Sequence, residues 1–166
     1  MFKNHRQKQI LSRLKEIEIK YEIRGLKSSD ISAILAIESE SFPDPWPKTA
    51  FEEIIRQSGH GGLVVVSDSK LLAYACYLII EHEAHLTNLA VVHSYKRKSI
   101  ASGLLERILD IANKKGCEHI LLEVRPQNKS AIAFYENAGF KLLYSRPNYY
   151  RNPVEDALVM VYYFNE

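Results

Sequence analysis

Hydrophobic positions at the start of the chain follow a helical period. Apolar residues recur every three or four positions among Lys, Arg and Glu within residues 1–20. This pattern predicts an amphipathic N-terminal helix that precedes the main domain and could mediate self-association. The apolar residues concerned are Ile10, Leu11, Leu14 and Ile17.

Two more helices are predicted in the next part of the chain. After a short strand-like segment, "YEIRGL", residues 28–30 can cap a helix whose inner positions are Ile31, Ile34, Leu35 and Glu38. A second helix is expected from Thr49 to Gln57. The proline-rich segment "FPDPWP" at 42–47 is predicted to form a rigid loop between these two helices.

The period then changes to that of strands. Residues 62–67, 71–81 and 84–92 are rich in β-branched and aromatic residues and are separated by short polar breaks, which predicts three antiparallel strands. The remainder alternates, with helices at 99–115 and 128–137 and strands at 119–125, 140–145 and 156–164. Such alternation predicts a locally parallel sheet, and therefore one mixed α/β domain over residues 21–166.

Composition narrows the class of protein. The chain has 166 residues, 22 Lys and Arg against 20 Asp and Glu, and a net charge of +2, so a nucleic acid is not expected as the main partner. The longest apolar run, at 71–80, is too short to span a membrane, and the N-terminus lacks a secretory signal; we therefore expect a cytoplasmic protein. Cys76 and Cys117 lack C-x-x-C spacing and are expected to be reduced thiols.

A basic loop lies between a predicted strand and a predicted helix. The strand ends at Val92 and the helix starts near Ser99, which brings free backbone N–H groups to one point and favours an anion. Lys96, Arg97 and Lys98 add positive charge there. The same pattern is also typical of a solvated turn. RNA binding is a less economical explanation of these basic residues, because no aromatic stacking motif accompanies them.

Several motifs resemble those of the GNAT acetyltransferases. These motifs, in order, are "FPDPW", "LTNLAV", "LLEVR", "NKSAIAFYENAGF" and "RPNYY…EDALVM". They resemble most closely the RimI family, which acetylates the N-terminal alanine of a small-subunit ribosomal protein. The resemblance runs from Tyr21 to Phe164 and leaves residues 1–20 outside. It implies the GNAT fold, a mixed and mostly antiparallel central sheet flanked by helices.

The resemblance also implies a cofactor and the residues that bind it. Acetyl-CoA would be the acetyl donor, with its pantetheine arm paired to a splayed strand and its pyrophosphate on the amides that open a helix. The residues implied are Leu89, Ala90 and Val91 in the strand, Lys96, Arg97, Lys98, Ser99, Ile100, Ala101 and Ser102 in the loop and helix start, and Asn128. No metal is expected, because "EHEAH" at 81–85 offers His82 and His85 without a convincing third ligand.

By the same resemblance, Glu123 is the general base and Tyr135 the general acid, while Asn148, Tyr149 and Tyr150 shape a peptide groove. These residue types suit the chemistry. An α-ammonium group has a pKa of about 8, so only about a tenth is free amine at neutral pH and a base is useful. Glu123 lies on an apolar strand and could accept the proton directly or through water. Tyr135 could protonate the departing thiolate, and no acyl-enzyme is required.

Each of these residues also has a purely structural interpretation. Glu123 could be paired with Arg125 or Arg24, Tyr135 could simply pack in the core, and Asn128 could cap a helix in addition to any other role. The residues also leave open which amine is the acceptor. A lysine or small-molecule amine is an alternative to a protein N-terminus, and a weakly active CoA-binding interaction module is an alternative of another class.

The basic loop departs from the family pattern at one position. The pattern is Q/R-x-x-G-x-G/A, whereas residues 96–101 are Lys-Arg-Lys-Ser-Ile-Ala. Ser99 in place of glycine is costly only if the turn requires a positive φ, and it is tolerable if the residue is already helical. We expect acetyl-CoA binding to persist.

Overall fold

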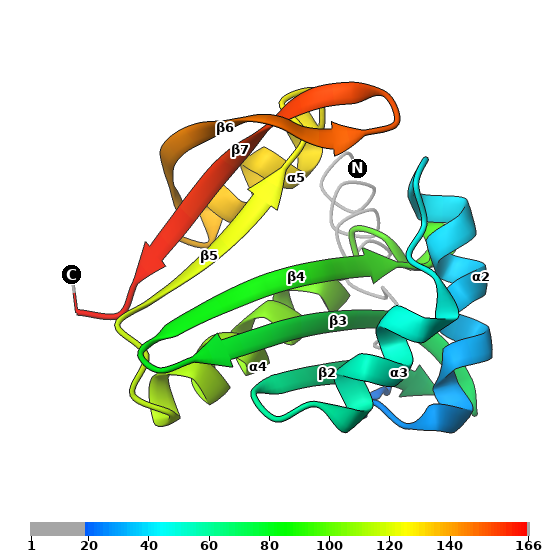
Figure 1. Cartoon of the computed structure of the whole chain (residues 1–166). Coiled ribbons are helices and arrows are strands. Elements are labelled where there is room, and N and C mark those ends of the chain that lie inside the picture. The colour runs from blue at the N-terminus through cyan, green and yellow to red at the C-terminus, as the bar shows by residue number, and fades with distance from the viewer. Residues whose placement is uncertain (1–18, 166) are drawn as a thin grey trace, which may run out of the picture.

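The computed structural model describes residues 19–165, and in that part of the chain seven strands form one sheet in the order β1-β2-β3-β4-β5-β7-β6 (Figure 1). The strands are β1 (Glu22–Gly25), β2 (His60–Ser67), β3 (Lys70–Ile80), β4 (Glu83–Val91), β5 (His119–Val124), β6 (Lys141–Arg151) and β7 (Val154–Tyr163). The α-helices are α2 (Ile31–Ser41), α3 (Lys48–Arg56), α4 (Ile100–Lys114) and α5 (Lys129–Asn137), and short 3-10 turns cover Ser28–Asp30 and His93–Tyr95.

Helices cover both faces of the sheet, with α2 and α3 on one side and α4 and α5 on the other (Figure 1). The alternation of side chains along β2 explains this arrangement, because successive residues of a strand point to opposite faces. Leu63 and Val65 belong to the core under α4, whereas Val64 belongs to the core under α2 and α3. The sheet is therefore apolar on both faces.

The directions of the strands agree with the prediction, whereas the order of the last two strands in the sheet was not predicted. Strands β1 to β4 pair antiparallel, and β4 pairs parallel with β5, as expected. Strand β6, which follows the next helix, runs parallel to β5 as expected, but the two strands are not neighbours, because β7 lies between them and pairs antiparallel with both. Either strand of a hairpin can pair with the edge of an existing sheet. The order of helices and strands along the chain does not reveal which of the two does so.

Two boundaries also differ. Strand β6 continues to Arg151 instead of ending at 145, and β7 begins at Val154 instead of 156. Pro147 and Asn148 are turn-forming residues, which favoured an early strand end; in the structure they lie where the pairing register shifts within the hairpin. The predicted helix of residues 1–20 and its four apolar positions, Ile10 to Ile17, lie outside the described residues.

Asp30 stabilises the entry to α2 in an unexpected way. Its carboxylate forms no bond to the amides of α2 and instead accepts the N–H of Lys27 at 2.8 Å. Both carboxylate oxygens also accept the guanidinium of Arg24, at 2.7 and 2.8 Å. The hydrogen bond from Arg24 is the main reason why the pKa of Asp30 lies below its usual range. No helix in the described part of the chain is long and apolar enough to cross a membrane.

Candidate active site

A cavity of about 510 Å³ opens where β4 and β5 separate. The two strands pair only from Glu83 opposite His119 to Leu86 opposite Leu122, and beyond that point they diverge (Figure 1). The walls come from the end of α2, the 42–47 loop, both strands, the start of α5 and the β6–β7 hairpin. Chain segments that are distant in sequence thus meet at one point.

Strand β4 offers free backbone groups to this cavity. Leu89, Ala90 and Val91 pair with β3 on one side, while the β5 side carries no strand at this level in the described structure. Backbone N–H and C=O groups of a strand alternate between its two sides, so part of this segment is available to an extended ligand that carries amides. The predicted splay of this strand is confirmed.

Glu123 follows immediately after the last parallel pair and lines the cavity. Its side chain is 16% exposed, and its nearest basic partner is Arg146, whose Nη1 lies 3.5 Å from Oε1. The two ion pairs considered from the sequence are wrong. Arg125 pairs with Glu155 and Arg24 pairs with Asp30, which leaves Glu123 with one long contact to an exposed guanidinium.

Tyr135 is both a core residue and a cavity residue. It extends from α5, is 9% exposed, and packs edge-on against Phe134 and Phe140 with centroids 5.1 and 5.6 Å away. It also lines the cavity. Burial, with a smaller contribution from Tyr150, raises the pKa of its hydroxyl above the usual value. The hydroxyl is therefore protonated at neutral pH and available as a hydrogen-bond donor.

Asn128 lines the cavity from the first position before α5. Its Oδ1 accepts the backbone N–H of Ala131 at 3.2 Å, so the predicted helix cap is confirmed. Because that oxygen is engaged with the helix, the side-chain NH₂ is the group of Asn128 that points away from the cap.

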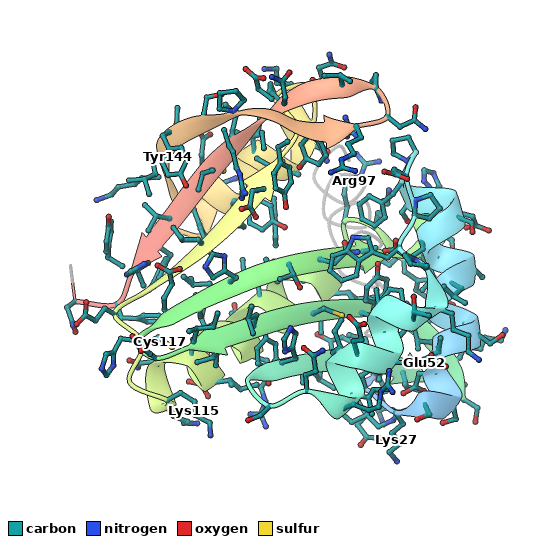
Figure 2. All side chains as sticks on the ribbon, in the orientation of Figure 1. Lys27, Glu52, Arg97, Lys115, Cys117 and Tyr144 are labelled. Carbon is teal, nitrogen blue, oxygen red and sulfur yellow. The ribbon has the colours of Figure 1, made fainter. Side chains whose placement is uncertain are left out.

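The basic loop before α4 has a backbone that glycine would suit. Ser99 precedes the helix with a φ of 60° and makes no side-chain cap bond, and Arg97 has a φ of 60° as well. The turn therefore requires a positive φ at Ser99, which is the case in which a serine there is costly. The first amides of α4 are free of intrahelical partners, as at the start of any helix, and the anion site expected there stays a prediction. Arg97 lies towards the end of the sheet where β4 ends (Figure 2). Residues 96–102 do not form part of the cavity wall.

The β6–β7 hairpin supplies an aromatic wall. Tyr149 and Tyr150 both line the cavity, with their rings edge-on and 5.0 Å apart. A guanidinium covers each ring: Arg146 lies 4.8 Å from the centroid of Tyr149, and Arg125 lies 3.9 Å from that of Tyr150. Burial raises the pKa of Tyr150 to about 12. Asn148 lies in the same segment, although its side chain is not part of the cavity wall.

Glu38 is a cavity residue whose importance the sequence did not reveal. Its carboxylate is completely buried at the end of α2 and accepts hydrogen bonds from the Tyr74 hydroxyl, from Asn88 Nδ2 at 2.7 Å and from the Trp46 N–H at 2.7 Å. Burial raises its pKa, although the Trp46 and Asn88 donors partly oppose that effect. An acidic residue at an inward position of an amphipathic helix was the available signal.

The histidines and cysteines lie elsewhere. Glu83 accepts hydrogen bonds from His85 on the same strand and from His119 on the neighbouring parallel strand, so the expectation of a solvated turn for this segment holds only for residues 81–82. Among the described residues, no group of three or more His, Cys, Asp or Glu side chains could hold a metal ion. Cys76 and Cys117 are buried free thiols, and Cys117 lies at the opposite end of the sheet from Arg97 (Figure 2).

Comparison with known proteins identifies the family to which this architecture belongs. The model of the acetyltransferase (GNAT) family matches residues 31–140. A [ribosomal protein bS18]-alanine N-acetyltransferase of Escherichia coli is 33% identical over 140 residues, covering 83% of this chain and 94% of the relative. An N-alpha-acetyltransferase of Saccharolobus solfataricus is 30% identical over 153 residues, covering 84% and 91%.

A solved structure supports the same assignment. The crystal structure of the ribosomal-protein-S18-alanine N-acetyltransferase from Escherichia coli matches with a TM-score of 0.80 and 31% identity, over 89% of this chain and 96% of the other. The chain belongs to the GNAT acetyltransferase family and is an acyl-CoA-dependent N-acetyltransferase. The predicted GNAT fold and the resemblance to the alanine N-acetyltransferases are thereby confirmed.

Proposed function

We propose that this protein transfers an acetyl group from acetyl-CoA to the α-amine of a protein, and that its acceptor is the N-terminal alanine of a small-subunit ribosomal protein. One observation carries the proposal: Glu123, Tyr135 and the Tyr149–Tyr150 pair, which come from three separate parts of the fold, line one cavity at the point where β4 and β5 separate. The relatives named for alanine N-acetylation support the choice of acceptor.

The cofactor is expected to lie between the free edge of β4 and the start of α4. The unpaired backbone at Leu89, Ala90 and Val91 suits the amides of a pantetheine arm. The amides of Arg97 to Ser102, with the nearby positive charge of Lys96 and Lys98, suit a pyrophosphate. Asn128 adds an amide donor from the start of α5. Serine in place of glycine at position 99 raises the conformational free energy of the turn, but it removes none of these backbone N–H donors.

Glu123 is the proposed general base. It lies beside the cavity with a mostly buried side chain, close enough to solvent to relay a proton through water. Deprotonation of the α-ammonium produces the free amine, which attacks the thioester carbonyl while a strand amide such as that of Val91 stabilises the oxyanion. As the acetyl carbon bonds to nitrogen, its bond to sulfur breaks; the nitrogen releases its second proton to water, and the thiolate takes up a proton, for which Tyr135 is the proposed donor and is itself reprotonated from solvent. No enzyme residue is acylated.

Tyr135 is the proposed donor to the leaving sulfur. This hydroxyl is protonated at neutral pH, as that of an ordinary tyrosine is, and burial raises its pKa further, so it can donate a hydrogen bond to the departing thiolate. A buried donor of this kind is most effective when charge develops on the sulfur during bond cleavage.

The acceptor's first residues are expected to lie between the 42–47 loop and the hairpin. The loop and the pair Tyr149 and Tyr150 both line the cavity, and Asn148 directly precedes the two tyrosines in β6. We expect this chemistry to take place in the cytoplasm. Residues 1–20 are proposed as an extension to the domain at 21–166, with a role in self-association.

The direct test is incubation of the purified protein with acetyl-CoA and a basic peptide that starts with alanine, followed by mass spectrometry with fragmentation. A gain of one acetyl group on the terminal nitrogen supports the proposal. A matched peptide with a blocked N-terminus and a free lysine tests the alternative acceptor. Acetylation of the second peptide only would refute the N-terminal assignment. Family membership already favours an enzyme over an interaction module.

A further inference from the structure

The β6–β7 hairpin contains an unusual irregularity beside the cavity. Arg146 is opposite Ala157 and Tyr150 is opposite Glu155, so Pro147, Asn148 and Tyr149 together face the single residue Asp156. Extra residues on one strand bend it and redirect its side chains. The irregularity therefore changes which face of the hairpin Tyr149 and Tyr150 present.

Both tyrosines line the cavity although they are adjacent in sequence. In a regular strand their side chains would point to opposite faces of the sheet, and only one could reach the cavity. The redirected backbone brings the two rings to 5.0 Å from each other. The aromatic wall of the site thus depends on the bulge at 147–149.

Asp156 holds this bulge. Its Oδ1 accepts the backbone N–H of Asn148 at 2.9 Å, and Asn148 has a φ of 51°. Pro147 has no N–H to donate, so the bulge cannot be fixed through that residue. The Asp156 carboxylate supplies the acceptor that the missing strand partner would otherwise provide.

Neighbouring ion pairs fix the hairpin on either side of this bond. Arg125 pairs with Glu155 at 3.0 Å and donates to the carbonyl of Asn152 at 3.1 Å, which holds the Tyr150 side of the bulge. On the other side, Arg146 contacts both Tyr149 and Glu123. The bulge therefore lies between two anchored points, and its own backbone is held by Asp156.

We propose that Asp156 is a positioning residue for the acceptor: by binding the Asn148 N–H it keeps Tyr149 and Tyr150 together on the cavity wall. The inference rests on the proposed function, in which these tyrosines contact the acceptor peptide. Asp156 itself is exposed and lies outside the cavity wall. Its effect should consequently fall on the binding of the peptide.

The test compares Asp156→Ala with Asp156→Asn, which retains an oxygen acceptor at the same place. With the alanine-starting peptide and acetyl-CoA, Asp156→Ala is expected to raise the KM for peptide about three- to tenfold, with little change in kcat or in the KM for acetyl-CoA. Asp156→Asn is expected to stay within about twofold of wild type. Asp110→Ala, which removes an exposed aspartate of α4, controls for the loss of one negative charge.

A structural measurement accompanies the kinetics. Hydrogen exchange of the Asn148 amide, followed by NMR, should accelerate in Asp156→Ala and remain slow in Asp156→Asn. Unchanged exchange, an unchanged KM for peptide, or equal losses for peptide and acetyl-CoA would overturn the role of Asp156. If wild type fails to acetylate the peptide, the proposed acceptor is wrong, and the amide exchange alone then decides whether Asp156 holds the bulge.

Discussion

The carboxylate of Glu38 and the side-chain amide of Asn88 are joined by a 2.7 Å hydrogen bond across the cavity wall, although fifty residues separate them in the chain. The same carboxylate accepts the N–H of Trp46, so one buried group connects α2, the 42–47 loop and β4. A fully buried carboxylate is costly unless its oxygens are occupied by donors, and here each oxygen has at least one. This wall of the cavity, beside which the acceptor peptide is proposed to lie, is built around Glu38.

Glu38→Gln should destabilise the protein more than its small change in shape suggests. The substitution replaces one accepting oxygen by an NH₂ group, which then faces a donor and leaves a buried polar group without a partner. We expect a loss of about 1–3 kcal/mol in the free energy of unfolding, measured by urea denaturation at neutral pH. Glu40→Gln, at an exposed position of the same helix, should change it by no more than about 0.5 kcal/mol. Equal effects of the two substitutions would contradict the structural role of Glu38.

Glu123→Gln should lower turnover far more than it weakens acetyl-CoA binding. Loss of a general base typically reduces kcat by about 10²–10⁴-fold, whereas the side chain has no part in holding the cofactor's phosphates. Steady-state kinetics and calorimetric titration with acetyl-CoA measure the two quantities separately. Glu118→Gln, an exposed residue just before β5, is the matched control. Comparable losses in turnover and affinity would remove Glu123 from the role of base.

Much of this fold could be predicted from local patterns. The period of two in β2 to β4, the helical periods of α2 to α5, and the cap at Asn128 depend on neighbours in sequence. The position of β7 could not be predicted in this way, because either strand of the final hairpin could have paired with β5. The choice between them depends on how the completed sheet buries its apolar faces.

The site was predictable where a motif contained it and hidden where it depended on distant contacts. Glu123 and Tyr135 lie in segments that resemble a known family, and both line the cavity. Glu38 could be identified only as an acid at an inward helical position, since its donors come from the 42–47 loop and two strands. Arg146 was likewise missed as the partner of Glu123, because the bulge that aims it follows from the pairing register of the hairpin.

Ser99→Gly tests the turn before α4. Because Ser99 has a φ of 60°, removal of its Cβ relieves a cost, and we expect the free energy of unfolding to rise by up to about 1 kcal/mol. Acetyl-CoA should bind equally well or more tightly in a calorimetric titration. Ser99→Ala retains the Cβ and removes only the hydroxyl, and its affinity should equal that of wild type. A large loss of affinity in both variants would show that the hydroxyl is a ligand.

Asp30→Asn should make the protein less stable in a way that depends on pH. The Arg24 guanidinium lowers the pKa of Asp30 in the folded state, so the folded protein favours the ionised carboxylate. The resulting stability is fully present above the unfolded pKa of about 3.9 and is lost as the pH falls through the lower, folded pKa. The variant should therefore lose about 1–2 kcal/mol at neutral pH, and its difference from wild type should shrink towards zero in strong acid.

Urea denaturation of wild type and Asp30→Asn at several pH values between neutrality and the acid limit measures this convergence. Asp110→Asn is the matched control, since Asp110 forms an exposed ion pair with Lys114 that solvent screens, and its effect should be small at every pH. A difference between wild type and Asp30→Asn that stays constant over the whole range would mean that the pair with Arg24 contributes through its shape and hydrogen bonds, whatever the ionisation of Asp30. In that case the carboxylate charge would not be what holds β1 to the entry of α2.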